Sequence, residues 1–360
     1  MVIRSRAPVR IDWAGGWTDV ALFTQEQRGA VVNAAVNIHS YVTAAKLQPK
    51  RVRSREYGYR HFREMQDKSV KVYSADFDIY QAADEIKNLE YDGNIDLAIA
   101  ALKRAEINSG IELITRSNAP AGSGLGSSAS MGVALVSALS RLNGSSVLPY
   151  ELAELASSIE RHELGILGGK QDQYASVLGG INFMEFSGEE VRTSRLQLSR
   201  DTIYELEKSL VLCYTGKSRL SSNIHQNVVD AYLGKDEETL DALRNLKQIA
   251  VAIKDALMTD DLFSFGKLLS ENWENQKRLH TSITNSQIDS LFDAALKNGA
   301  VGGKACGAGG GGCLIFFCYP DKEHLVRKTL EEAGVTMIDF NFDFAGLQTW
   351  EGYQPDNDAQ

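Results

Sequence analysis

The sequence predicts an α+β fold in which two domains pack closely together. Three observations lead to this prediction: 360 residues are enough for two domains, strand patterns dominate the first part of the chain, and long helical periods follow Ser199. The change of pattern places the boundary between residues 195 and 210, which gives domains of residues 1–200 and 201–360. A single domain is the alternative.

Strand patterns occur in several segments of the first domain. In residues 2–11, β-branched residues alternate with arginines, and the run ends at Gly15 and Gly16, where a tight turn is expected. Further strands are expected in residues 29–47 and 110–116, with an exposed hairpin or meander in the basic stretch 49–75. Helical periods are expected in residues 94–108, 131–142, 149–163, 240–258 and 262–274.

The charge balance argues against nucleic acid as a partner. The formal net charge is −9, whereas nonspecific binding of a polyanion requires a dense basic patch. The basic stretch 49–75 is the one candidate for such a patch, but the rest of the chain is acidic. A nucleotide can still bind, because backbone amides and a few charges are sufficient.

Cysteine spacing and hydropathy indicate a soluble protein of the reducing cytoplasm, with no membrane association. The four cysteines lack paired CxxC spacing, and the N-terminus lacks a charged segment followed by a long apolar one. We therefore expect neither a zinc site nor a signal peptide. No segment approaches the ~20 apolar residues that a membrane-spanning helix requires.

A glycine- and serine-rich loop, residues 118–130, joins an expected strand to an expected helix. Its glycines permit positive φ and close approach to a ligand, while the helix start offers unpaired N–H groups to an anion. It is neither a Walker A loop nor a Rossmann turn. The alternative is a turn without ligand, in which Ser127 or Ser128 only caps the helix. The residues expected to bind a polyphosphate are Pro120, Gly122, Ser123, Gly124, Leu125, Gly126, Ser127 and Ser128.

Two carboxylates and one arginine add the groups that phosphoryl transfer needs. The reaction requires in-line positioning, Mg²⁺ on the phosphates and a group that orients or deprotonates the attacking hydroxyl. Glu160 suits the metal, and Asp172 suits the hydroxyl. Arg10 is expected to stabilise the transferring phosphoryl group or to lower the pKa of Asp172. The alternative for each is a solvated surface charge.

Three separated segments, residues 7–19, 120–130 and 304–313, together resemble the motifs of the GHMP kinases. The resemblance implies a two-domain fold with the active site in the cleft between the domains, and a ferredoxin-like second domain. It also implies that the glycine-rich loop wraps the phosphates of ATP, that Asp172 and Arg10 are catalytic, and that Ser128 and Glu160 hold Mg²⁺.

Within this family the chain is most similar to the sugar 1-kinase branch, and there to bacterial D-glycero-D-manno-heptose 7-phosphate kinases. Such an enzyme uses ATP to phosphorylate the anomeric hydroxyl, giving a 1,7-bisphosphate for synthesis of nucleotide-activated heptose. A substrate that already carries a phosphate needs cations at its far end. The residues expected to contact the substrate are Trp17, Thr18, Asp19, Lys170, Lys217, Arg219, Gly309 and Gly310.

Three other functions stay open. An L-fucose or other hexose 1-kinase is the nearest alternative, because L-fucose kinase modules share the Ala-Gly-Gly-Trp sequence that ends here at Trp17. A sensor that binds nucleotide and sugar without catalysis belongs to another functional class. The third is an isoprenoid-pathway kinase or decarboxylase on the same scaffold. The expected partners are a small sugar or sugar phosphate, and the expected state is a monomer or homodimer.

Overall fold

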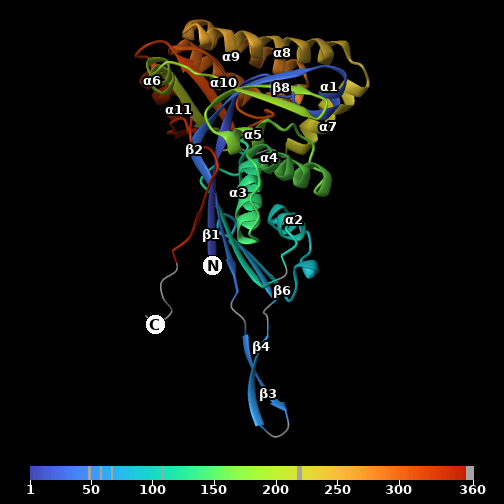
Figure 1. Ribbon diagram of the computed structural model, residues 1–360. Coiled ribbons are helices and arrows are strands. Elements are labelled where there is room, and N and C mark those ends of the chain that lie inside the picture. Colours follow the sequence, from blue (N-terminus) through green and yellow to red (C-terminus); the bar gives the residue numbers. More distant parts are fainter. Residues whose placement is uncertain (48–49, 57–58, 66–67, 108, 217–220, 354–360) are drawn as a thin grey trace.

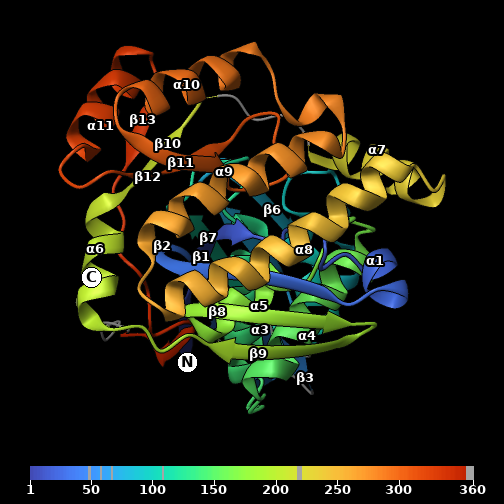
Figure 2. The same ribbon diagram turned by 90° about the horizontal axis from the view of Figure 1, so that it is seen from above.

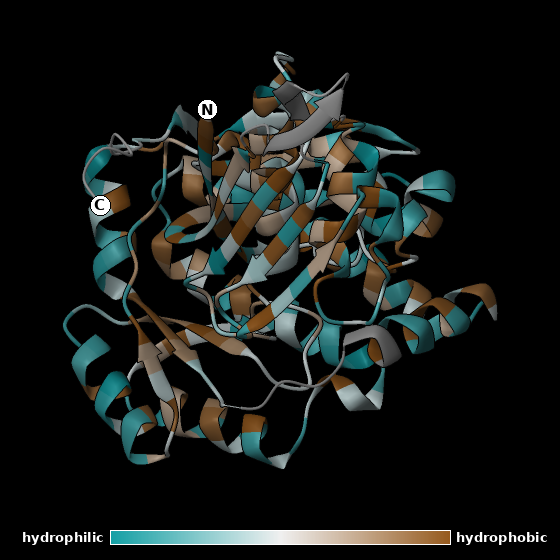
Figure 3. Ribbon diagram, turned by 90° about the horizontal axis from the view of Figure 1, so that it is seen from below, coloured by the Kyte–Doolittle hydropathy of each residue, from teal (hydrophilic) through white to brown (hydrophobic). Residues whose placement is uncertain are grey.

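The computed structural model describes residues 1–47, 50–56, 59–65, 68–107, 109–216 and 221–353. Strands and helices are mixed throughout these residues (Figure 1), so the predicted α+β class is confirmed. Hydrophobic residues are concentrated on the interior strands and hydrophilic residues on the outer helices (Figure 3). None of the described helices has the length and apolar composition needed to cross a membrane.

Most of the described strands belong to one large sheet. Its main path has the order β14-β1-β2-β7-β5-β6, and β8 pairs with both β2 and β9. Strand β2 is a single long strand because it pairs with β1 along one edge and with first β8 and then β7 along the other. The strands are β1 (Val2–Ala14), β2 (Gly29–Lys46), β5 (Val70–Ser74), β6 (Ile79–Ala83), β7 (Ile111–Ser117), β8 (Ile181–Ser187), β9 (Glu190–Arg195) and β14 (Gln348–Glu351).

Both faces of the central strands are covered by helices. Val31 belongs to the core on the side of α3, whereas the adjacent Val32 belongs to a second core that includes α8. Because side chains alternate between the faces of a strand, this burial explains the almost continuous apolar run in β2. Figure 2 shows α8 and α9 lying across the upper face. The helices on these faces are α2 (Asp96–Arg104), α3 (Ser127–Leu142), α4 (Pro149–Ser158), α5 (Gln171–Leu178), α8 (Glu237–Met258) and α9 (Leu262–Arg278).

A smaller antiparallel sheet has the strand order β11-β12-β10-β13. Its strand β12 is buried at every position, since helices and the large sheet surround it. Its strands are β10 (Leu210–Tyr214), β11 (Ala300–Ala305), β12 (Cys313–Cys318) and β13 (Thr336–Ile338). Two helices, α10 (Ser286–Lys297) and α11 (Glu323–Glu332), lie beside this sheet.

The remaining elements are helices, single helical turns and one projecting hairpin. The hairpin of β3 (Lys50–Glu56) and β4 (Tyr59–Met65) extends away from the body of the molecule (Figure 1), as the basic stretch predicted. These helices and helical turns are α1 (Ala21–Glu26), η1 (Ile86–Asn88), η2 (Ile159–Glu163), α6 (Arg200–Ser209), α7 (Ser221–Leu233) and η3 (Thr281–Ile283).

We propose that residues 1–200 and 201–360 are the two domains. Strand β9 ends at Arg195 in the large sheet, and β10 begins at Leu210 in the small one. The chain later returns to the large sheet, because β14 pairs with β1.

A buried ion pair joins the two sheets. Lys304 of β11 has no exposed surface, and its Nζ lies 2.8 Å from Asp12 Oδ2 and 2.7 Å from the Asp12 main-chain oxygen on β1. Its charge is therefore balanced by a residue of the other sheet. Removing one partner of such a pair leaves an uncompensated buried charge.

We predict that Lys304→Met lowers the free energy of unfolding by about 3–5 kcal/mol. The double variant Asp12→Asn/Lys304→Met removes both charges and recovers most of this loss. Urea denaturation followed by circular dichroism measures both. An equally large loss in the single and double variants would contradict the assignment.

Candidate functional site

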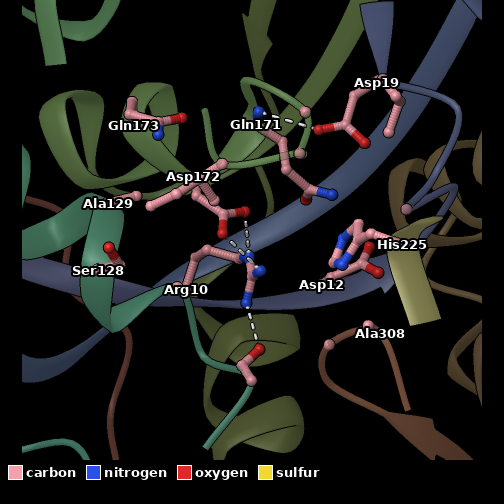
Figure 4. Close-up of a pocket in the computed structure, with 18 of the residues that line it drawn as sticks. Arg10, Asp12, Asp19, Ser128, Ala129, Gln171, Asp172, Gln173, His225 and Ala308 are labelled. Carbon is pink, nitrogen blue, oxygen red and sulfur yellow. Dashed lines mark hydrogen bonds and ion pairs between the residues drawn. The ribbon is translucent and has the colours of Figure 1, made fainter. Parts of the chain in front are cut away.

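A pocket of about 360 Å³ lies where the two sheets meet. Segments far apart in the sequence line it, including β1, the glycine-rich loop, η2, the start of α5, α7 and the loop after β11. Figure 4 shows its two sides, with Ser128 and Ala129 on one side of Arg10 and Asp172, and Asp19, His225 and Ala308 on the other. The expected site residues that line it are Arg10, Trp17, Asp19, Gly122, Gly124, Gly126, Ser127, Ser128, Glu160 and Asp172.

The glycine-rich loop presents the start of α3 to the pocket. Gly122, Gly124 and Gly126 have φ values of 65°, 74° and 74°, which is the left-handed backbone that the sequence predicts for them. Gly126 occupies the N-cap position, and no side chain in the described part of the protein accepts a hydrogen bond from the first-turn amides there. The alternative in which Ser127 or Ser128 only caps the helix does not apply, because Gly126 occupies the cap position. The uncapped amides and the helix dipole favour an anion at this point.

Two of the glycines are also required by close contacts. A Cβ atom on Gly126 would lie 2.9 Å from Asp172 Oδ2, and one on Gly124 would lie 3.2 Å from the backbone of Gly307. Any larger residue would push the loop away from the carboxylate or from the segment after β11. The loop thus approaches both sides of the pocket.

Three of the loop residues expected to bind the polyphosphate lie outside the pocket lining. Ser123 and Leu125 have no exposed surface, and their main-chain oxygens accept hydrogen bonds from Cys313 N and Arg10 N. The main-chain oxygen of Pro120 accepts from Ser123 N. These residues shape the loop and do not face the pocket.

Arg10 and Asp172 form a two-pronged ion pair in the middle of the pocket. Arg10 Nε lies 2.7 Å from Asp172 Oδ1, and Arg10 Nη2 lies 2.8 Å from Asp172 Oδ2 (Figure 4). Arg10 Nη1 also donates to the main-chain oxygen of Gly124 at 2.7 Å. This geometry fixes the carboxylate and leaves the Asp172 side chain 25% exposed, which is enough for a ligand to reach it.

Glu160 lies beside Ser128 on the side of the pocket formed by the glycine-rich loop. The sequence predicts one helix over residues 149–163, but α4 ends at Ser158, and Glu160 belongs to the π-helical turn η2. Its carboxylate accepts hydrogen bonds from the Ser128 hydroxyl and from the Gln173 amide. Burial, with a smaller contribution from Asp172, raises the pKa of Glu160 to about 7.

Asp19 lies on the opposite side of the pocket. Its Oδ2 accepts a hydrogen bond from Gln171 N at 3.1 Å. Burial, followed by the negative charge of Asp172, raises the pKa of Asp19 to about 7. The neighbouring Thr18 has no exposed surface, and its hydroxyl donates to the main-chain oxygen of Gly15 at 2.7 Å. Thr18 therefore holds the turn and does not face the pocket.

Trp17 has an unusual backbone conformation for a bulky residue, with φ of 80°. Its indole packs against the His225 ring of α7, with ring centroids 4.6 Å apart. Both residues line the pocket. The strained turn therefore places an aromatic wall at the same end as Asp19.

Several expected substrate residues do not line the pocket. Lys170 is 4% exposed, and its Nζ lies 2.9 Å from Glu154 and 2.7 Å from Glu189, so its charge is already paired. Gly309 and Gly310 pack against Ile283, while the neighbouring Gly307 and Ala308 line the pocket instead. Lys217 and Arg219 lie outside the described residues.

Sequence reasoning missed other lining residues. Asp12 follows Arg10 by two positions on β1, so strand alternation is a signal that points to it. Gln171 and Gln173 flank Asp172 directly. His225 has no such local signal, because only the docking of α7 brings it to the pocket. The missed residues with polar side chains are Asp12, Gln171, Gln173 and His225.

The pocket suits an oxygen-binding cation better than a soft metal. Glu160 and Ser128 offer oxygen atoms on one side, and the described residues contain no group of three His, Cys, Asp or Glu side chains placed to hold a metal. Mg²⁺ commonly takes one or two carboxylates and completes its shell with phosphate oxygens and water. This donor set fits a metal that arrives with a phosphorylated ligand.

Comparison with known proteins identifies the family. Residues 94–180 match the N-terminal domain of GHMP kinases, and residues 253–336 match the C-terminal domain. A D-glycero-alpha-D-manno-heptose 7-phosphate kinase from Campylobacter jejuni is 31% identical over 354 residues, which cover 97% of this chain and 98% of that protein.

Two further matches are more distant. An L-fucokinase/L-fucose-1-P guanylyltransferase from Bacteroides fragilis is 28% identical over 346 residues, which are 92% of this chain and 36% of that protein. The crystal structure of a D-glycero-D-manno-heptose 1-phosphate kinase from Bacteroides thetaiotaomicron matches with a TM-score of 0.77 and 28% identity, covering 98% of this chain and 100% of that one.

The predicted GHMP-kinase fold is thereby confirmed. The similarity extends along nearly the whole chain, and both domain models match it in the expected order. The chain belongs to the GHMP kinases, a family of phosphotransferases that use an alcohol group as acceptor.

Proposed function

We propose that this kinase transfers the γ-phosphoryl group of ATP to the anomeric hydroxyl of D-glycero-D-manno-heptose 7-phosphate. The product is the 1,7-bisphosphate, a precursor of nucleotide-activated heptose. One observation carries the proposal: three groups line a single pocket. They are the uncapped amides at the start of α3, the Arg10–Asp172 ion pair, and the side-chain oxygens of Ser128 and Glu160. The name of the Campylobacter relative supports the choice of acceptor.

The loop side of the pocket is the proposed nucleotide end. Gly122, Gly124 and Gly126 bring backbone close to the ligand, and Ser127 and Ser128 begin the helix whose amides face the phosphates. The guanidinium of Arg10 lies between this loop and Asp172. In that position its charge stabilises negative charge on the transferring phosphoryl group.

Ser128 and Glu160 are the proposed ligands of Mg²⁺. Their oxygens already meet in a hydrogen bond, and the buried carboxylate has no cationic partner among the described residues. When bound, Mg²⁺ would neutralise charge on the phosphates. Gln173 orients Glu160 through its amide.

Asp172 is the proposed acceptor of the hydroxyl proton. The oxygen of the anomeric hydroxyl attacks the γ-phosphorus and forms the new O–P bond. The bond from the γ-phosphorus to the bridging oxygen breaks, and ADP leaves with its electron pair. The proton of the hydroxyl passes to Asp172, whose side chain Arg10 holds in a fixed orientation.

Trp17 and Asp19 form the proposed acceptor end. Asp19 accepts hydrogen bonds from ring hydroxyls, and Trp17 offers an apolar wall to the ring. Lys217 and Arg219 stay candidates for the distal phosphate, whereas the pairing of Lys170 leaves its expected role without support. We propose a cytoplasmic enzyme, active as a monomer or homodimer.

L-fucose is the second candidate acceptor, because the negative charge at the acceptor end of the pocket favours neutral hydroxyl groups over a phosphate. Asp19 lines this end, and a carboxylate accepts hydrogen bonds from hydroxyls but repels a phosphate. The Bacteroides fragilis relative carries the name of an L-fucokinase.

A screen of ADP release distinguishes these acceptors. We expect turnover of D-glycero-D-manno-heptose 7-phosphate in preference to L-fucose, galactose and mannose. Preferred turnover of L-fucose would transfer the assignment to the second candidate. If nucleotide binds but no sugar is phosphorylated, the protein is a sensor and the proposal is wrong.

We predict that Asp172→Asn lowers kcat by about 10²–10⁴-fold, because the proton acceptor is lost. ATP binding should persist, since the loop amides are unchanged. Single-turnover kinetics and calorimetry measure the two effects. Asp343→Asn is the matched control: Asp343 forms a buried pair with His39 at 2.7 Å and does not line the pocket. An Asp172→Asn enzyme with the wild-type kcat would contradict the mechanism.

The raised pKa of Asp19, about 7, predicts a pH-dependent KM for the acceptor. Below this value the free enzyme carries a protonated Asp19, which no longer binds hydroxyls as a carboxylate. The acceptor KM should rise by up to about tenfold per pH unit below the pKa and level off above it. Asp19→Asn should give a high KM that does not change with pH. A flat wild-type profile would exclude this role.

A further inference from the structure

Gln173 has one buried amide atom without a hydrogen-bond partner. The residue lies in the first turn of α5, is 3% exposed and lines the pocket. Figure 4 shows it on the same side of the Arg10–Asp172 pair as Ser128. Its Nε2 donates to Glu160, but its Oε1 is buried and accepts no hydrogen bond from the described residues. Burial of an acceptor without a partner is unfavourable, so this oxygen calls for a partner that a ligand supplies.

The contact with Glu160 determines which amide atom of Gln173 is left over. A carboxylate accepts hydrogen bonds, so the amide nitrogen faces Glu160 and the amide oxygen remains without a donor. Both atoms are bonded to the same carbon, so Oε1 lies close to this contact. Helix α5 packs against α3 and α4, which holds the side chain in the interior. The unpartnered oxygen is therefore fixed beside the proposed metal ligand Glu160.

Three side chains with oxygen atoms converge at this side of the pocket from three different elements. Ser128 begins α3, Glu160 belongs to η2 and Gln173 belongs to α5, and both neighbours donate a hydrogen bond to Glu160. Glu160 is 6% exposed and has no cationic partner among the described residues. A hydroxyl or water from a ligand would satisfy the amide oxygen but not the charge of Glu160. A cation satisfies both.

A small, hard cation fits this position best. Mg²⁺ binds oxygen ligands at about 2.0–2.1 Å. This distance is shorter than the contact between an oxygen atom and a water molecule, so the ion can reach an amide oxygen that is closed to bulk water. An amide oxygen, a hydroxyl and a carboxylate together leave room for phosphate oxygens and water in an octahedral shell.

We propose that Gln173 is a third side-chain ligand of the metal, through Oε1, beside Ser128 and Glu160. The proposal rests on the proposed function, because it assumes that Mg²⁺ arrives with ATP at this side of the pocket. It gives one amide two tasks: the nitrogen orients Glu160, and the oxygen binds the ion. It also accounts for the lack of a group of three His, Cys, Asp or Glu side chains among the described residues, because a hydroxyl and an amide supply two of the three oxygens.

The test uses Mn²⁺, which takes the same oxygen ligands as Mg²⁺, together with a non-hydrolysable ATP analogue and no sugar. Gln173→Leu should weaken binding of Mn²⁺ to the protein–nucleotide complex by about tenfold or more, measured by electron paramagnetic resonance. Water should replace the missing oxygen, so the number of water molecules bound to Mn²⁺ should rise by about one, measured by relaxation of water protons. Gln173→Glu keeps an oxygen ligand and should bind Mn²⁺ at least as tightly as the wild type, with the same number of bound waters.

Gln171→Leu is the matched control, because it removes an equally buried amide on the other flank of Asp172, where Gln171 N contacts Asp19. It should leave the affinity for Mn²⁺ and the number of bound waters as in the wild type. An equal loss of affinity in both leucine variants would show a general disturbance of α5 and would overturn the inference.

Two other results would overturn the inference and leave the proposed function intact. Weaker binding of Mn²⁺ by Gln173→Leu with an unchanged number of bound waters would show that the amide only orients Glu160. Unchanged affinity would show that Gln173 is remote from the ion. If the wild-type complex with the nucleotide binds no Mn²⁺, the proposed metal site fails, and the inference fails with it. Because no sugar is present, none of these results depends on the identity of the acceptor.

Discussion

The ion pair between Arg10 and Asp172 determines the geometry of the whole site. Arg10 donates to both carboxylate oxygens of Asp172 and to the main-chain oxygen of Gly124, and its backbone N donates to Leu125. The pair therefore joins β1, the start of α5 and the glycine-rich loop. Because one guanidinium contacts both the loop and the carboxylate, it fixes the proposed phosphate site and the proposed site of the attacking hydroxyl relative to each other.

Burial raises the pKa of two other carboxyl groups of the pocket, those of Glu160 and Asp19. Glu160 and Asp19 lie on either side of the pair, and the pKa of each is raised to about 7, chiefly by burial and further by the charge of Asp172. Arg10 is paired with Asp172 and compensates neither of them. Such groups are poised to gain a cation or a hydroxyl donor from a ligand. One buried carboxylate, Glu160, thus lies on the proposed metal side of the pocket, and another, Asp19, lies on the proposed acceptor side.

The sequence predicted what depends on local patterns. The positive φ of Gly122, Gly124 and Gly126 followed from their spacing before a helix, and the confirmed α+β fold followed from strand and helix periods. Tertiary contacts decided the rest. Lys170 reads as a free cation in the sequence, but Glu154 and Glu189 pair with it. The partners of a flexible side chain leave no periodic signal in the sequence, whereas the positive backbone φ of a glycine can be expected from its position in a turn.

The most direct test is a crystal structure of the protein with Mg²⁺ and a non-hydrolysable ATP analogue. We predict that the β- and γ-phosphates contact the backbone amides between Gly122 and Ser128, with the metal between Glu160 and the phosphates. The γ-phosphorus should lie next to Arg10, with Asp172 open to the acceptor side. A triphosphate bound elsewhere, with the start of α3 free of ligand, would contradict this prediction.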